Sequence, residues 1–342
     1  MAEDEAEQEL SESEIEAQLV ALAGTVVDEY RRKALPLLAE AEAKRAHFQY
    51  LLNAYWDEAF AHYDLSYRLA YDIGHGINER NRAAASSRKD RVFEVLARLH
   101  SWALLTASEV RALVTTGHGG GALALSRTAM EQATIATFIQ ERGQDVADRF
   151  LKHGPYEERK RIQEYNKAAT ALGEKTYDAT ELARIEKECA DLARDYGNNY
   201  LGPYGWAANT LFPGRPDSTP NYRHVEEATN IKQIRHYYVL ASTRIHAGAT
   251  GSGAHLYRAS WGGGYNTGPS NTRLALPASS TLMALLQCAA AFSTHALKEY
   301  GDRQPTAQFM ALRRLNQEAV ASFNRIEQAL ATPLAREVET TN

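Results

Sequence analysis

The feature that most limits the fold of this chain is the spacing of its apolar residues. They recur at intervals of three and four along most of the 342 residues, and no run of useful length alternates polar and apolar residues as a β-strand would. In the first such stripe, between residues 11 and 46, the apolar positions are Ile15, Leu19, Leu22, Val26, Val27, Tyr30 and Leu37. We therefore predict an all-α protein, a multi-helix bundle with long N-terminal helices.

Proline and glycine divide this helical pattern. Pro36 should kink the first helix, and Gly74 and Gly76 should weaken or break the last third of the second, over residues 48–82. Further helices are predicted over residues 89–116, 122–142, 146–172, 179–198, 225–249, 278–300 and 305–331. The two remaining long stretches, 200–223 and 251–277, are rich in glycine or proline and are predicted to be irregular loops.

These segments group into four parts. Residues 1–16 should form a disordered acidic tail, 17–107 the long N-terminal helices, 108–251 a helical core, and 252–342 a loop followed by a C-terminal helical pair. Within the core, the glycine run 117–121 follows a helical pattern and no strand, so we interpret it as a helix stop and not as a phosphate-binding loop.

Charge is concentrated at the N-terminus. The first 16 residues hold eight of the 43 acidic residues and no basic one, which leaves 35 acidic against 38 basic residues over the rest. A body so close to neutral lacks the basic stripe of most duplex nucleic-acid binders, although a local basic cleft could exist within it. The chain begins without a signal-peptide pattern and contains no apolar run of about 18 residues, so we expect a cytoplasmic protein with no membrane partner.

The sequence offers no strong metal or cofactor motif, and we predict neither. Cys189 and Cys288 are far apart, which indicates neither a disulfide framework nor a thiolate zinc site. No Glu-x-x-His pair of the di-iron type and no His-Glu-x-x-His motif occurs. The remaining metal candidates, His246, His255 and Glu131, include two histidines that straddle a glycine-rich helix end.

A guanidinium and a carboxylate are predicted to face the interior from the helix 122–142. At about 100° per residue, Arg127 and Glu131 fall one turn apart within its apolar stripe. They either satisfy each other as a structural pair or line a pocket. In a pocket, the guanidinium would suit a phosphate or carboxylate, and the carboxylate could act as a base.

The helix 225–249 carries a second set of polar residues. Arg235, Ser242 and His246 lie at the edge of its apolar stripe, which also contains Tyr238. A lone histidine on such a face is more often a hydrogen-bonded core residue than a catalyst, but here a serine and an arginine accompany it. We predict that the polar residues of the two helices form one site.

At these positions the sequence resembles a family of bacterial proteins, domain of unknown function 5677. The shared pattern is a glycine-preceded Leu-x-Arg-x-x-x-Glu helix, a Tyr-Gly-Trp-Ala element and a Tyr-x-x-x-Ser-x-x-x-His-Ala-Gly helix. This chain matches it over residues 108–251 at Leu125, Arg127, Glu131, Tyr204, Gly205, Trp206, Ala207, Tyr238, Ser242, His246, Ala247 and Gly248. The resemblance implies that these polar and aromatic positions are characteristic of the family, but it implies no reaction. We expect Tyr204, Trp206, Tyr238 and Arg235 to line the pocket.

A second candidate pair is Arg111 and His118. Six residues separate them, a spacing similar to the Arg-x(4 to 6)-His motif of HEPN-type ribonucleases. On one continuous helix, seven positions place both side chains on the same face. They could then serve as phosphate binder and general acid or base in metal-free RNA cleavage.

Two functions remain compatible with these residues. The favoured one is a non-enzymatic binding or interaction module, in which the polar network fixes packing and the N-terminal helices bind a protein partner or self-associate. The alternative is a metal-independent ribonuclease or phosphoester hydrolase of a bacterial toxin or antiviral defence type, with nucleic acid as a partner. Its catalytic residues would be His246 for proton transfer, Arg127 for anion stabilisation, Glu131 for orientation, and Ser242.

Overall fold

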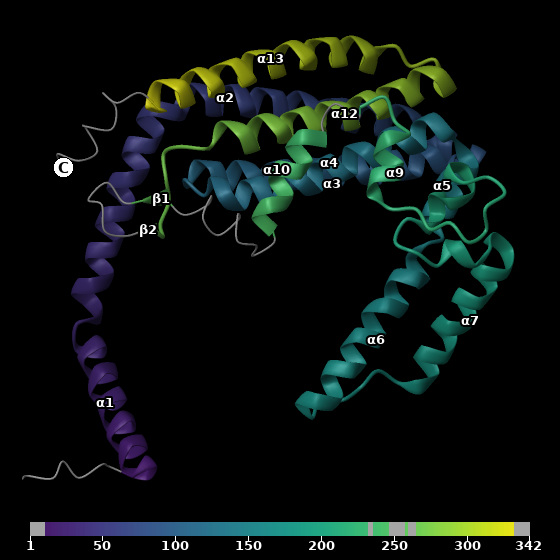
Figure 1. The fold of residues 1–342 in the computed structure, drawn as a ribbon. Helices are drawn as coiled ribbons and strands as arrows, with labels where there is room; N and C mark the ends of the chain where they lie inside the picture. The colour runs from purple at the N-terminus through teal and green to yellow at the C-terminus, as the bar shows by residue number, and fades with distance from the viewer. Residues whose placement is uncertain (1–10, 232–234, 246–256, 259–264, 332–342) are drawn as a thin grey trace, which may run out of the picture. The chain divides into compact units, whose positions relative to one another are not determined.

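The computed structural model describes residues 11–231, 235–245, 257–258 and 265–331 (Figure 1). The longer helices of this part are α1 (Glu12–Arg32), α2 (Ala34–Arg88), α3 (Arg91–Thr115), α4 (Gly119–Arg142), α5 (Gln144–Leu151), α6 (Gly154–Leu172), α7 (Ala179–Tyr196), α10 (Arg235–Ile245), α12 (Ala275–Tyr300) and α13 (Gln304–Ala331). The shorter ones are η1 (Asn198–Tyr200), η2 (Gly205–Ala207), α8 (Ala208–Leu211) and α9 (Tyr222–Glu227). The predicted all-α bundle is confirmed.

The chain divides into two compact units, residues 1–54 and residues 55–342. The first contains α1, which ends at Arg32 because Pro36, in the first turn of α2, has no N–H and its ring crowds the carbonyl four residues earlier. The helix begins at Glu12, where the Glu14 carboxylate accepts the backbone N–H of Ser11 at 2.9 Å. Residues 12–16, predicted as tail, are therefore helical, and residues 1–10 lie outside the described part.

The predicted interruption at Gly74 and Gly76 is wrong, because α2 continues to Arg88. Gly74 instead permits a close approach of α3. A Cβ there would lie 2.3 Å from Cδ2 of His100, and that ring donates from Nε2 to the Ala70 carbonyl at 3.0 Å. Burial lowers the pKa of His100 to about 4, so the imidazole is neutral in the folded protein.

The core of the second unit consists of α3, α4 and α12, which pack on one another, with α13 packed on α12. Phe292 of α12 lies at its centre, fully buried, with its ring centroid 5.2 Å from that of Phe93. By length and composition α12 could cross a membrane, but 67% of its most apolar window is buried within the fold. Most of this window is therefore covered by other parts of the fold.

Asp90, the N-cap of α3, ties the start of that helix to α12. Its carboxylate accepts the Phe93 backbone N–H at 2.9 Å, and it lies 2.7 Å from Nε2 of His295 and 2.5 Å from the Tyr300 hydroxyl. Burial opposes ionisation, but these hydrogen bonds together hold the pKa of Asp90 well below its usual range. The carboxylate therefore remains charged inside the fold.

Two predicted helices are split in the structure. The segment 146–172 becomes α5 and α6, because Pro155 begins a new helix in the first turn of α6. The described part of the segment 225–249 belongs to α9 and α10, and α9 begins at Tyr222, three residues earlier than predicted, where Asn221 caps it. In the second irregular loop, two residue pairs form an antiparallel contact, β1 (Tyr257–Arg258) with β2 (Tyr265–Asn266).

Candidate functional site

The predicted pair Arg127 and Glu131 forms, and Tyr238 joins it. One turn apart on α4, the two side chains approach to 3.1 Å between Nη2 and Oε1. Because α10 packs on α4, the Tyr238 hydroxyl lies between them: it accepts from Arg127 at 2.5 Å and donates to Glu131 at 2.9 Å. The Arg127 guanidinium also lies over the tyrosine ring, 4.7 Å from its centroid. We call these three residues the α4–α10 network.

Arg127 and Glu131 were predicted to face the interior, but the α4–α10 network is partly open to solvent. The side chains of Arg127 and Glu131 are 28% and 27% exposed. Burial opposes the charge of Arg127, but the Glu131 carboxylate and the Tyr238 hydroxyl together raise its pKa. Burial, with the charge of Glu131, raises the pKa of Tyr238 to about 12, so the phenol keeps its proton. The network is thus a compensated ion pair bridged by a neutral hydroxyl.

Aromatic rings extend the site on one side. Tyr222 stacks on Tyr238 at 4.3 Å between centroids, and its hydroxyl lies 3.0 Å from the Thr134 hydroxyl oxygen. Tyr204 follows at 6.2 Å from Tyr222, whereas Trp206 is 2% exposed and belongs to the core. Sequence analysis missed Tyr222, because it lies at the edge of a segment predicted as loop. The helix-capping Asn221 before it was the available signal.

Ser242 and Arg235 each make a polar contact in the structure. The Ser242 hydroxyl donates to the Tyr238 carbonyl one turn earlier, at 2.8 Å. Arg235 pairs with Glu226, whose side chain is fully buried. His246 and His255 lie outside the described residues, so the prediction that His246 joins Arg127 and Glu131 stays a prediction.

Arg111 and His118 do not share a helix. Because α3 ends at Thr115, His118 becomes the N-cap residue of α4, and the seven-position argument for a common face no longer applies. The guanidinium of Arg111 donates to both carboxylate oxygens of Asp64, at 2.7 and 2.8 Å. The guanidinium N–H groups that would bind a phosphate are thus already bound to a carboxylate.

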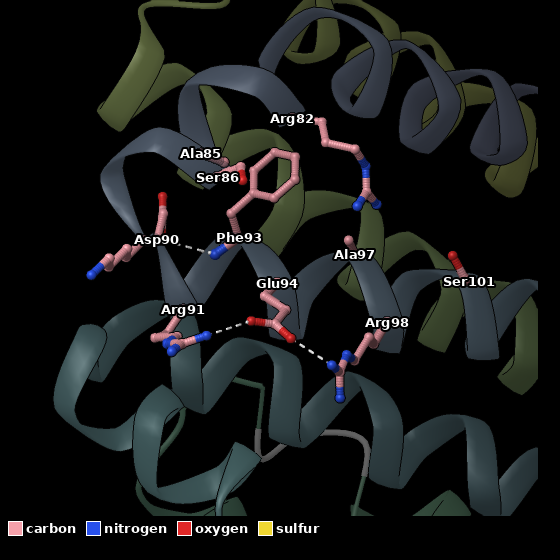
Figure 2. Close-up of a pocket in the computed structure, with 11 residues that line it drawn as sticks. Arg82, Ala85, Ser86, Asp90, Arg91, Phe93, Glu94, Ala97, Arg98 and Ser101 are labelled. Carbon is pink, nitrogen blue, oxygen red and sulfur yellow. Dashed lines mark hydrogen bonds and ion pairs between the residues drawn. The ribbon is translucent and has the colours of Figure 1, made fainter.

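A basic cleft of about 490 Å³ lies where α2 meets α3 (Figure 2). Its lining includes four cations, Arg82, Lys89, Arg91 and Arg98. Figure 2 shows Glu94 between two of them. Its carboxylate lies 3.0 Å from the Arg91 guanidinium and 2.5 Å from that of Arg98. The lining has one other carboxylate, the buried Asp90, so cations outnumber carboxylates and positive charge predominates in this cleft. Among the residues that the structure describes, no three His, Cys, Asp or Glu side chains gather as a metal site.

Residues 93–262 match a family of unknown function, DUF5677, which extends the resemblance seen over 108–251 at both ends. The matched segment runs from α3 past α10 and therefore contains the whole α4–α10 network. No curated protein and no solved structure matches the chain.

Proposed function

The chain belongs to the DUF5677 family, whose function is unknown, and from this premise we propose that it is a non-catalytic helical module that self-associates through α1. The observation that carries the proposal is the exposure of α1, none of whose residues is buried. Its apolar stripe is exposed at Ile15 (45%), Leu19 (60%), Leu22 (60%), Val26 (45%) and Tyr30 (67%). An isolated helix of this length is marginal in water, so a packed partner would supply most of its stability.

The spacing of this stripe suits another helix. The residues Ile15, Leu19, Leu22 and Val26 follow one another at intervals of four, three and four, as in a coiled-coil seam. Helices pair in this way by inserting the apolar residues of each into spaces on the other. The exposed stripe therefore fits a helical partner better than a flat surface.

Charge favours a second copy of the chain in antiparallel orientation. The start of α1 carries Glu12, Glu14 and Glu16 without a cation, and its end continues into the cations Arg31, Arg32 and Lys33. Two of these cations also pair within the helix, Arg31 with Asp28 and Lys33 with Glu29. An antiparallel pair sets the acidic start of one copy against the basic end of the other, whereas a parallel pair sets like charges together.

The α4–α10 network supports the non-catalytic part of the proposal. Arg127, Glu131 and Tyr238 each have their charge or hydroxyl engaged by another member, and together they fasten α10 to α4. The ribonuclease alternative has less support, because Arg111 is engaged by Asp64. RNA cleavage or phosphoester hydrolysis by the purified chain, abolished in a folded His246→Ala variant, would contradict the non-catalytic reading. We place the module in the cytoplasm.

The mass of the full chain in solution, measured by light scattering after size exclusion, tests self-association. We expect about twice the 38.0 kDa of one copy. Leu19→Asp with Leu22→Asp should give the mass of one copy. The matched control, Ala17→Asp with Ala21→Asp, adds the same charges on the opposite face of α1 and should leave the larger mass intact.

A charge-reversal series tests the orientation. In an antiparallel pair, Glu12→Lys with Glu16→Lys should weaken association, and adding Arg31→Glu, Arg32→Glu and Lys33→Glu should restore it. In a parallel pair the first change would replace one like-charge contact with another and leave the association unchanged. A wild-type chain that stays single at high protein concentration would refute self-association itself.

A further inference from the structure

An open cleft of about 650 Å³ lies at the start of α4, formed by residues between 117 and 327. Its volume falls within the range of small-molecule sites, roughly 300 to 1,000 Å³. The apolar part of its wall comes from α4, α10, α12 and α13, through Leu123, Tyr237, Leu240, Leu276, Met283 and Val320. These side chains would accommodate the apolar body of a ligand.

Another part of the lining is suited to an anion. Gly119, Gly120 and Gly121 are the first residues of α4, a helix of 24 residues, and all three line the cleft. The N-cap residue, His118, makes no side-chain capping hydrogen bond. The first amide groups of a long helix, at the positive end of its dipole, are therefore uncapped by a side chain at this point.

Ser279 of α12 supplies an independent indication of a ligand. It lines the same cleft and is 8% exposed, and its hydroxyl is buried with no hydrogen-bond partner in the part of the chain that the structure describes. A buried hydroxyl without a partner costs free energy, and a ligand oxygen would remove that cost.

The carboxylate of Glu327 in this lining does not oppose an anion in the way an unpaired carboxylate would. It accepts backbone N–H groups at the start of α12, from Arg273, from Leu274 at 2.9 Å and from Ala275 at 3.2 Å. Its negative charge is thus compensated by the α12 N-terminus.

We propose that this cleft binds a small amphipathic molecule through one carboxylate or phosphate group. The anionic head meets the amides at the start of α4 and the Ser279 hydroxyl, and the apolar body lies against the leucine, methionine and valine side chains of the wall. This site does not depend on self-association, because no residue of α1 contributes to its lining.

Calorimetric titration of the full chain with four probes of equal tail length tests the proposal: octanoate, octyl phosphate, 1-octanol and octyltrimethylammonium. We expect at least one anion to bind with one molecule per chain, about tenfold or more tighter than the alcohol, and the cation not to bind. The tighter of the two anions identifies the head group. Equal affinity for the alcohol and both anions, or no binding of either anion at about 1 mM, would overturn the proposal.

A serine pair on α12 provides the variant and its control. Ser279→Ala should weaken anion binding about tenfold, because it removes one hydrogen bond to a charged group. Ser293→Ala removes another buried hydroxyl without a partner among the described residues, 3% exposed and outside the cleft, and should leave the affinity unchanged. Both variants should fold, since neither breaks a hydrogen bond of the described chain. Equal affinities in wild type and Ser279→Ala, or equal losses in both variants, would contradict the site.

Discussion

Two helices with apolar stripes, α1 and α12, differ in how far they are buried. Among the 26 residues of α12, 16 are buried, whereas none of the 21 residues of α1 is. The periodicity of the sequence predicts both helices equally well, yet it does not show what covers each apolar face. For α12 the covering surface is α3, α4 and α13 of the same chain. For α1, none of whose residues is buried, we propose a second copy of the chain as the covering surface.

Truncation of one apolar side chain in each helix should give the largest contrast in stability. Phe292→Ala empties a fully buried position of α12 and should lower the free energy of unfolding by about 3 to 5 kcal/mol. Leu22→Ala in α1, which is 60% exposed, should change it by less than about 0.5 kcal/mol in dilute solution. Urea denaturation of both variants measures the contrast. Similar losses would show that α1 packs within its own chain.

The buried core, unlike α1, contains a histidine, His100, that should make the free energy of unfolding depend on pH. Its pKa is about 4 when folded, against an ordinary value of about 6.5 when unfolded. As the pH falls below 6.5, only the unfolded chain takes up this proton, so stability should decrease by about 3 kcal/mol by pH 4. The decrease associated with Asp90 begins lower, below an unfolded value of about 3.9.

Denaturation of wild type and His100→Gln between pH 7 and pH 4.5 isolates this effect, because the glutamine does not titrate. We expect the slope to flatten in the variant. An equal slope in both proteins would mean that His100 is accessible to protons in the folded state.

The α4–α10 network should show a smaller effect, because it is only partly buried. Arg127→Ala leaves Glu131 with the Tyr238 hydroxyl and with water, so we expect a loss of about 1.5 to 3 kcal/mol. Tyr238→Phe removes only the bridging hydroxyl and keeps the stacked ring. A double-mutant cycle of the two substitutions measures their coupling. Additive losses would show that the three residues are no network.

Features that depend on residues close together in the chain could be predicted from the sequence, whereas those that depend on distant residues could not. The α3, α4, α12 and α13 boundaries followed from periodicity, and the pairing of Arg127 with Glu131 followed from their spacing on one helix. The break predicted at Gly74 failed because the preference of a glycine was overridden by the packing of His100, a residue 26 positions away along the chain.

The same limit explains the outcome at the candidate site. Tyr238 was predicted on the correct helix, but its place between Arg127 and Glu131 depends on how α10 packs on α4, which local spacing does not encode. Arg111 was predicted to bind phosphate, but its guanidinium pairs with Asp64 on another helix. Local spacing could not reveal this partner, because it lies 47 positions away along the chain. Long-range pairs of this kind decide whether a polar residue is free or engaged.

Hydrogen–deuterium exchange of the full chain at two protein concentrations tests self-association through α1 most directly. We predict that amides of α12 are protected at both concentrations, because their helix is buried within one copy. Amides of α1 should be protected at the high concentration and exchange rapidly at the low one, as two copies separate. Protection of α1 that is the same at both concentrations, whether high or absent, would contradict the account.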